Sequence, residues 1–298
     1  MDTRQHATGA TAAEGRRPVT VRLLGGPTAL IEIGGLRLLT DPAFEPPGPA
    51  AGGTRTVAGP RCSAADVEAM GPLHAVLLSH GRYADSLGVA GERLLATVPV
   101  TFTTTCAANR LGGTAVGLRP WYHLTLARPD GGCLKVTATA SRGGGREGHA
   151  GGERERGPGA DAGPVIGFVL TGPDVPTIYV SGDDAPSLDI ASEVADRFGP
   201  VEVAVLGDAR RVPADPLPMP VALRAARAAE ILGARTVIPV HPDAWEHCAT
   251  APGTQREAVA RHGLQDRLLL LAPGTPITLR PERPAATPDP TRPAPDAP

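Results

Sequence analysis

The chain has almost no excess charge and almost no lysine. Over 298 residues, 29 basic residues stand against 31 acidic ones, which gives a formal net charge of -2, and Lys135 is the single lysine. Proteins that bind nucleic acids or anionic membranes usually carry a strong positive field. We therefore expect a small-molecule substrate as the partner, with no nucleic acid and no membrane. The preference for arginine over lysine, with 37 glycines and 33 prolines, indicates a GC-rich genome.

Cysteine is scarce and scattered. The four cysteines are far apart in the sequence and form no Cys-x-x-Cys pair: Cys62, Cys106, Cys133 and Cys248. A disulfide framework or a cysteine-based zinc site needs closer or denser spacing. We expect buried or free thiols instead.

Long apolar runs and the phosphate-loop and serine-hydrolase motifs are also lacking. Residues 1–17 contain no apolar core of a signal peptide, and no run approaches the ~18 residues of a membrane span. No GxxxxGK[ST] or GxSxG pattern is present, so phosphate-loop and serine-hydrolase mechanisms lack their motifs. We expect a soluble, cytoplasmic protein, and nothing in the sequence indicates its oligomeric state.

What is present is enough apolar sequence for one sizeable core, because 41% of the residues are hydrophobic. Residues 1–17 have no hydrophobic periodicity, and residues 281–298 contain seven prolines in eighteen positions. Both are predicted to be disordered tails. Residues 143–163 hold nine glycines in twenty-one positions, which predicts a long flexible loop. The folded domain is expected to span residues 18–280.

Short apolar runs separated by glycine and proline predict about a dozen strands with helices between them. The expected strands are 19–24, 28–33, 36–40, 75–79, 98–102, 123–127, 133–139, 165–170, 177–181, 201–207, 236–240, 268–272 and 275–279. The expected helices are 64–70, 89–96, 105–111, 187–198 and 220–232. This order favours two sheets covered by helices in a single α/β sandwich.

Polar side chains with catalytic or metal-binding capacity follow several of these strands. Asp41 comes after the third strand, and His80 and Asp85 come after the fourth. Asp183 and His241 follow two later strands. Any one of them fits a capped turn, but loops at strand ends are where rigid scaffolds display functional groups. Together they favour a common site.

Six blocks of sequence, in order and at matching spacing, resemble the hydrolases of the metallo-β-lactamase fold. The likeness covers about residues 19–280 and is closest to the branch of ascorbate-phosphate lactonases and related small-molecule hydrolases. The resemblance implies an α/β, four-layer αββα sandwich with two mixed sheets. The matching blocks are LLGGPTALIEIGGLRLLTDPAF (23–44), AVLLSHGRYADSLGVAG (75–91), KVTATASRGGG (135–145), GPVIGFVL (163–170), IYVSGDD (178–184) and RTVIPVHPDAWEH (235–247).

The resemblance also implies which residues hold a metal ion. In the related branch the first metal loop reads His-x-x-His-x-Asp-Asn, and His80 and Asp85 match its first His and its Asp. Asp183 matches the bridging Asp of the family, and His241 matches its last His. The implied metal ligands are therefore His80, Asp85, Asp183 and His241, with Asp183 or His80 holding the attacking water.

Two of the three histidines of the family's first metal site are missing from this chain. Tyr83 stands where the loop has its second His, and Gly143 stands where an Ala-Arg-His-Gly block has its third. A catalytic zinc needs about three protein ligands and an open position for water. The remaining two carboxylates and one imidazole suit one ion, Zn²⁺ or also Mn²⁺ or Fe²⁺. His149 and Tyr83 are the alternative replacement ligands. Without a metal role, His149 is expected to be solvated, and Tyr83 to pack or form a hydrogen bond.

Four further residues have two interpretations each. Asp41 lies in a Thr-Asp-Pro turn and either orients a ligand loop or stabilises its own turn. Asp184 is either an additional ligand or the N-cap of the following helix. Trp245 and His247 either both line the pocket or have structural roles. In the second case Trp245 packs in the interior and His247 lies on the surface.

Two functions remain open at this point. The first is a metal-dependent hydrolase of a small ester, lactone or phosphoester, with a single-metal or weakened site. The second is a catalytically inactive pseudoenzyme that keeps the fold and binds a ligand or a protein. The metal content of the purified protein distinguishes them.

Overall fold

The computed structural model describes nine stretches of the chain, which contain both sheets and all the helices treated below. Residues 1–15 of the predicted tail at 1–17, the predicted tail at 281–298 and the predicted glycine-rich loop at 143–163 lie outside them. The described residues are 16–44, 48–49, 56–57, 63–81, 87–140, 165–182, 186–207, 221–240 and 263–280.

The first sheet has seven strands in the order β15-β1-β2-β3-β6-β7-β8. Its first four strands pair antiparallel, and β3, β6, β7 and β8 pair parallel. Glycine-containing turns join β1 to β2 and β2 to β3, as the sequence predicts. The bounds are β1 (Val19–Gly25), β2 (Thr28–Ile33), β3 (Leu36–Thr40), β6 (Ala75–Leu77), β7 (Thr101–Thr104), β8 (Ala115–Leu118) and β15 (Pro276–Leu279).

The second sheet has six strands in the order β14-β13-β12-β11-β10-β9. Strands β9 to β12 pair antiparallel, and β12, β13 and β14 pair parallel. A separate pair is formed by β4 (Gly48–Pro49) and β5 (Thr56–Val57). The bounds are β9 (His123–Ala127), β10 (Cys133–Ala138), β11 (Phe168–Gly172), β12 (Val175–Val180), β13 (Val203–Leu206) and β14 (Thr236–Pro239).

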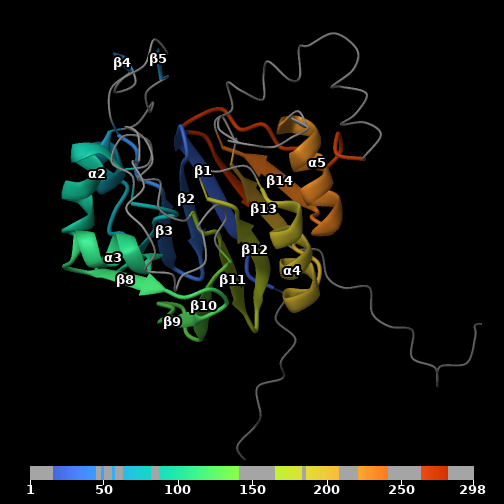
Figure 1. Cartoon of the computed structure of the whole chain (residues 1–298), viewed down its shortest axis with the longest axis horizontal. Coiled ribbons are helices and arrows are strands. Elements are labelled where there is room, and N and C mark those ends of the chain that lie inside the picture. The colour runs from blue at the N-terminus through green and yellow to red at the C-terminus, as the bar shows by residue number, and fades with distance from the viewer. Residues whose placement is uncertain are drawn as a thin grey trace, which may run out of the picture.

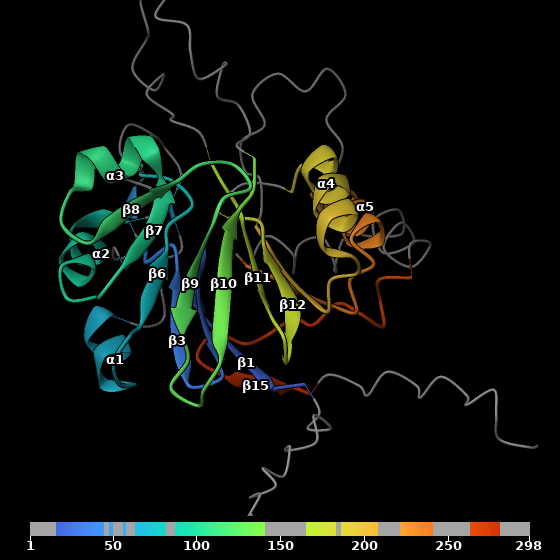
Figure 2. The same ribbon diagram turned by 90° about the horizontal axis from the view of Figure 1, so that it is seen from below.

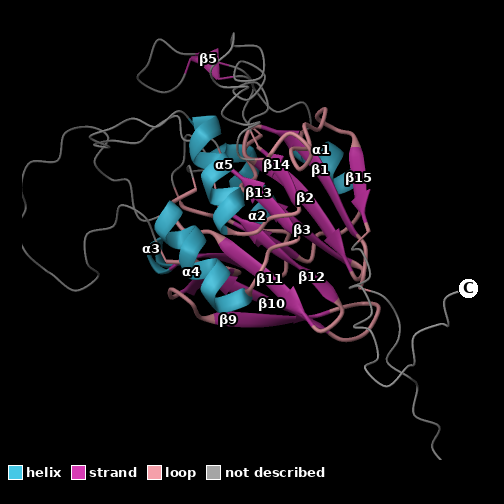
Figure 3. Cartoon of the chain, turned by 90° about the vertical axis from the view of Figure 1, so that its right-hand side faces the viewer, coloured by secondary structure: helices cyan, strands magenta, loops and turns pink. Residues whose placement is uncertain are grey.

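Helices cover the outer face of each sheet, so the molecule has four layers (Figures 1 and 2). α1 (Ala64–Ala69), α2 (Gly88–Leu95) and α3 (Thr105–Leu111) lie on the side of the first sheet. α4 (Leu188–Phe198) and α5 (Val221–Ile231) lie over the second sheet (Figure 3). The expected αββα sandwich with two mixed sheets is confirmed. Within the described residues, no helix has the length and apolarity needed to cross a membrane.

The alternation of side chains along each strand divides the core into three layers. In β2, Ile31 and Ile33 face the space between the sheets, whereas Leu30 faces the helices of the first sheet. In β12, Ile178 lies between the sheets, whereas Tyr179 lies under α4 and α5. The inner layer joins strands of both sheets into one cluster. The inner strands β6 and β13 are therefore wholly apolar, because both faces of the sheet are covered there.

The strands differ from the expectation in several places. The run 268–272 is not a strand, since only Leu268 forms a bridge, parallel to Val237 of β14. The expected strand 98–102 begins later, at Thr101, because Val98 still belongs to the turn that ends α2, where its amide donates to Leu95. Strand β8 at Ala115–Leu118 was not expected. Its sequence, AVGL, is too short to give a periodic signal.

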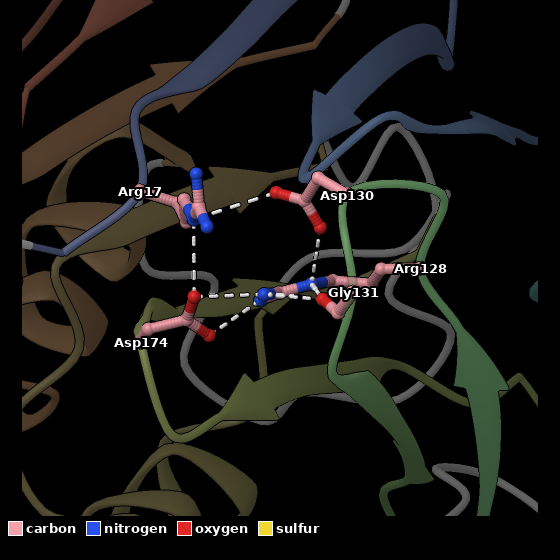
Figure 4. A network of polar contacts seen from close by, with 5 residues as sticks. All are labelled: Arg17, Arg128, Asp130, Gly131 and Asp174. Atoms are coloured by element: carbon pink, nitrogen blue, oxygen red, sulfur yellow. Dashed lines mark hydrogen bonds and ion pairs between the residues drawn. The ribbon is translucent and has the colours of Figure 1, made fainter. Parts of the chain in front are cut away.

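A network of ion pairs ties the two sheets together at one edge of the sandwich (Figure 4). Its centre is Arg128 in the β9–β10 turn, whose side chain is 2% exposed. Arg128 donates two parallel hydrogen bonds to the carboxylate of Asp174 in the β11–β12 turn, at 2.6 and 2.7 Å. Its Nε donates to Asp130 at 3.0 Å, and its guanidinium also donates to the carbonyl of Gly131. These hydrogen bonds satisfy Nε, Nη1 and Nη2 of the buried guanidinium.

The same network holds the first sheet and the start of the chain. A Cβ at Gly34, in the β2–β3 turn, would lie 2.6 Å from Cδ of Arg128, so only glycine admits this side chain there. Arg17 donates to Asp174 at 3.1 Å, and Arg16 forms an ion pair with Glu202. Arg16 and Arg17, which the sequence analysis placed in the N-terminal tail, thus contact the folded domain.

Candidate functional site

The carboxyl ends of β12, β13 and β14 lie side by side, because these strands are parallel. Past the end of β12, the amide of Ser181 donates to Val205 at 2.9 Å. Past the end of β14, the amide of Val240 donates to Leu206 at 2.9 Å. The amide of Gly207 donates to the hydroxyl of Ser181 at 2.7 Å. The loops that carry Asp183 and His241 thus leave the sheet next to each other.

The end of β6 in the first sheet meets the end of β12 in the second. The carbonyl of Ser79 accepts a hydrogen bond of 3.0 Å from the amide of Ile166, which precedes β11. Gly182 has φ +82°, and a Cβ there would lie 2.7 Å from Cβ of Ser79. Glycine at 182 therefore permits a contact that any larger residue would prevent. This contact brings His80, the residue after Ser79, next to the strand end that precedes Asp183.

The end of β10 leaves the second sheet at the same edge. Thr139 makes two hydrogen bonds with Gly167. Its amide donates to the Gly167 carbonyl at 2.9 Å. The hydroxyl of Thr139 accepts from the amide of Gly167, also at 2.9 Å. Because a Cβ at Gly167 would lie 2.6 Å from the carbonyl oxygen of Val180, this segment also lies against the end of β12. Four strand ends of the second sheet and that of β6 thus share one edge of the sandwich.

His80 is the one predicted metal ligand that the structure describes. It is 3% exposed, and its Nδ1 lies 3.0 Å from the hydroxyl oxygen of Ser79. An imidazole this deeply buried at a strand end is held in one orientation by its surroundings. Gly81, the next residue, is also held, because Arg110 of α3 donates a hydrogen bond to its carbonyl.

Asp41 orients the loop that carries His80. Its carboxylate oxygen Oδ1 accepts a hydrogen bond of 2.7 Å from the amide of Ser79. Asp41 follows β3 and Ser79 follows β6, and these two strands are neighbours in the sheet. Asp41 itself is 2% exposed and has φ +31°, an unusual value for a residue other than glycine. The hydroxyl of Thr28 donates to its carbonyl at 2.6 Å and supports this conformation. Of the two interpretations of Asp41, the structure supports the one in which it positions a ligand loop.

The other predicted site residues lie outside the described residues. They are Asp85, Asp183 and His241 among the ligands, and Tyr83, Gly143, His149, Asp184, Trp245 and His247 among the residues with alternative roles. Within the described part of the chain, no group of three or more histidine, cysteine or acidic residues forms a metal site. The described strand ends determine where the segments with Asp85, Asp183 and His241 start: after Gly81, Gly182 and Val240. The first two of these starts lie together, at the contact of Ser79 with Gly182.

Two residues of this edge were missed in the sequence, Ser79 and Arg110. Ser79 stands beside a candidate ligand in the sequence, but a serine at the end of a strand gives no signal of its own. Arg110 lies 29 residues from Gly81, the residue that it contacts. In a chain with so many arginines, nothing distinguished this one.

The donor set suits a divalent metal ion. Two imidazoles and two carboxylates, on loops that start from one edge, are ligands that Zn²⁺, Mn²⁺ and Fe²⁺ accept. The buried position of His80 and the positioning contact from Asp41 are the kind of support that metal ligands commonly have. Of these donors the structure describes His80, whose burial and contact with Ser79 suit a metal ligand.

Comparison with known proteins was made at the level of sequence and of structure. No protein-family model matches the chain, and no curated protein matches it in sequence. Among solved structures, an isothiocyanate hydrolase from Delia radicum gut bacteria matches with a TM-score of 0.60 and 22% identity. The match covers 87% of this chain and 98% of that one.

Two other structures give the same result. The metallo hydrolase Igni18 from Ignicoccus hospitalis has a TM-score of 0.62 at 18% identity, over 89% of this chain and 100% of its own. The metallo-β-lactamase fold protein YhfI from Bacillus subtilis has a TM-score of 0.51 at 14% identity, over 87% and 99%. The chain has the metallo-β-lactamase fold. Strand ends of both sheets meet at one edge of this fold in the present chain, and the loops predicted to hold metal start there.

Proposed function

We propose that the chain is a metal-dependent hydrolase of a small ester, lactone or phosphoester, with a single ion held by Asp85, Asp183 and His241, together with His80. The observation that supports this most is the contact between Ser79 and Gly182. It joins the strand end that carries His80 to the one that carries Asp183, although the two strands belong to different sheets. The structural neighbours described as hydrolases support the reaction class, since they share the fold.

A bound divalent ion polarises a carbonyl or phosphoryl oxygen and lowers the pKa of a water ligand toward neutrality. The protein's own groups then have three tasks. Asp183 accepts a hydrogen bond from the attacking water and keeps it oriented. Asp41 holds the Ser79 backbone and with it the start of the His80 loop. The buried setting of His80 excludes competing water from that side.

The test begins with the metal content of protein purified without chelator. We expect at most one tightly bound ion per chain, because the residues that match one metal site are retained and two histidines of the other are replaced. Asp183→Asn and His241→Gln should each abolish binding of that ion. As matched controls, Asp196→Asn and His123→Gln change exposed residues of the same types in α4 and β9 and should retain it.

Hydrolysis is then measured on a panel of lactones, carboxylic esters and phosphodiesters, with an aryl isothiocyanate added because one structural neighbour is named for that substrate. Activity that requires the ion and is lost in Asp183→Asn supports the proposal. Two tightly held ions would contradict the single-metal site.

A pseudoenzyme remains the second candidate, since Tyr83 and Gly143 replace two histidines of the family pattern. Such a protein binds no ion, or binds one and turns over none of the panel. Its melting temperature rises with a small molecule or a partner protein that occupies the same edge.

A further inference from the structure

Ser79 makes contacts on all of its polar groups at the end of β6. It is fully buried. Its amide donates to Asp41 at 2.7 Å, and its carbonyl accepts from Ile166 at 3.0 Å. Its hydroxyl oxygen lies 3.0 Å from Nδ1 of His80. The backbone of Ser79 is therefore fixed from two sides, and its side chain is directed at the imidazole of its neighbour.

The strand end opposite keeps this side chain in place. A Cβ on Gly182 would lie 2.7 Å from Cβ of Ser79 and 3.3 Å from its hydroxyl oxygen. The serine thus fills the space that the missing Cβ of Gly182 leaves. In such packing a side chain has little freedom to turn. The packing against Gly182 therefore keeps the Ser79 side chain in the rotamer that contacts Nδ1.

We propose that Ser79 is a positioning residue that fixes the tautomer of His80. A neutral imidazole carries its proton on one nitrogen and its lone pair on the other, and the partner of one nitrogen decides which is which. With Nδ1 turned to Ser79, the nitrogen of His80 that can ligate an ion is Nε2. The hydroxyl of Ser79 therefore accepts the Nδ1 hydrogen, which leaves the ligating lone pair on Nε2.

This inference rests on the proposed function only in taking His80 as a ligand. Asp41 has a different task, because its carboxylate accepts a hydrogen bond from the backbone amide of Ser79. The two residues form a chain in which Asp41 places the peptide and Ser79 orients the imidazole. Neither touches the substrate or the reacting atoms.

Nitrogen NMR of the metal-free protein tests the tautomer directly. The protein is labelled with ¹⁵N-histidine and measured at pH 8, and His80→Gln identifies the signals of His80. We expect wild-type His80 to carry its proton on Nδ1. In Ser79→Ala it should shift toward the Nε2-protonated form, which histidine favours in water. Wild-type protein with the proton on Nε2 would overturn the proposal.

Ser181→Ala is the matched control. Ser181 is also a buried serine at a strand end, but its hydroxyl accepts from Gly207 and donates to Gly182. Its loss should leave the His80 nitrogen signals unchanged. If both serine variants change the tautomer equally, the effect reflects general loosening of the edge, and the role assigned to Ser79 is wrong.

The functional readout is the affinity for zinc alone, measured by competition with a chromogenic chelator. Ser79→Ala should bind zinc about ten-fold more weakly, the usual effect of losing a partner of a metal-ligating histidine. Ser79→Thr and Ser79→Cys keep a group that can accept the Nδ1 hydrogen, and whichever of them retains the wild-type melting temperature should restore the affinity. Unchanged affinity in Ser79→Ala overturns the positioning role. If the wild-type protein binds no zinc, the proposed function fails, whereas the NMR result still decides the tautomer.

Discussion

The two edges of the sandwich are built differently. Strands β10 and β12 both start at the Arg128 network and end at the candidate site. At the start, short turns bring together charged groups that satisfy one another, around a guanidinium 2% exposed. At the other end, the chain enters loops that carry His80, Asp85, Asp183 and His241, the residues with metal-binding capacity.

The difference shows how one scaffold separates stability from chemistry. At the network edge every charge has a partner from another turn, so the edge holds the sheets in register. At the loop edge, buried polar residues such as Asp41 and Ser79 direct their hydrogen bonds at neighbouring loops. Changes at the first edge should therefore alter the free energy of unfolding, and changes at the second should alter binding. The following experiments test this division, beginning with the largest expected effect.

Restoring histidines at the loop edge should create metal binding without altering stability. Tyr83→His with Gly143→His adds the two imidazoles that the family pattern has at these positions. We expect one additional zinc ion per chain by elemental analysis and a partial gain of hydrolysis, because ordering the chain at residue 143 costs roughly 1–2 kcal/mol. The free energy of unfolding of the metal-free protein should stay within about 0.5 kcal/mol. Absence of a second ion would mean that one of the two positions is wrongly matched.

Asp174→Asn should show the opposite behaviour. The variant removes the charge that Arg128 and Arg17 both contact and leaves a buried guanidinium with less compensation. We expect the free energy of unfolding to fall by about 2 kcal/mol, below the full effect for a completely buried pair since Asp174 is partly exposed. Urea unfolding measures it. Zinc affinity should be unchanged, and a parallel loss of zinc binding would contradict the separation of the two edges.

The same aspartate should make stability depend on pH in the acid range. Hydrogen bonds from Arg128 hold the pKa of Asp174 well below its ordinary value of 3.8. A lowered pKa in the folded state means that the contribution is complete above about pH 4 and is lost as pH falls through the folded value. Urea midpoints between pH 5 and pH 2 should therefore fall more steeply for the wild type than for Asp174→Asn. Identical slopes would exclude Asp174 as the group responsible.

Two truncations should locate the start of the folded body. A chain that begins at Arg16 keeps the contacts of Arg16 and Arg17 with Glu202 and Asp174, whereas a chain that begins at Pro18 loses them. We expect the first to melt like the wild type and the second to melt about 3 °C lower, which corresponds to roughly 1 kcal/mol in a protein of this size. Equal melting temperatures would show that these ion pairs contribute nothing measurable, as is common for exposed pairs.

A pair of threonine substitutions should give the smallest difference. The hydroxyl of Thr40, beneath Asp41, accepts from Ala29 and donates to the carbonyl of Pro27. The hydroxyl of Thr103 is also buried but has no hydrogen-bond partner within the described part of the chain. Thr40→Val should lower the free energy of unfolding by about 1 kcal/mol, and Thr103→Val should leave it unchanged or raise it. Thermal unfolding of the two variants side by side measures the difference, and equal losses would contradict the assignment of these partners.

Much of the fold could be predicted from the sequence because its signals are local. The runs at 19–24, 28–33 and 36–40 with glycine between them predicted antiparallel strands, and β1, β2 and β3 lie there. A helix was expected at 64–70, and α1 begins at Ala64, where Ser63 and Asp66 form a capping box. The prediction of a strand at 268–272 was wrong, because it too used only local signals. The leucines of this run fit a strand locally, but whether a segment pairs depends on the neighbouring strand.

The sequence by itself determined the elements, the alternation of apolar side chains and the positions of polar residues after strands, since each depends on neighbours a few residues away. Only the tertiary structure decided which distant groups meet. Arg17 and Asp174 are 157 positions apart, and the contact of Ser79 with Gly182 crosses from one sheet to the other. Such contacts follow from how two sheets pack face to face, which no short stretch of sequence encodes. For that reason His80 and Asp183 were recognisable as candidates from the sequence. Ser79, which contacts His80 and lies against the strand end before Asp183, was not.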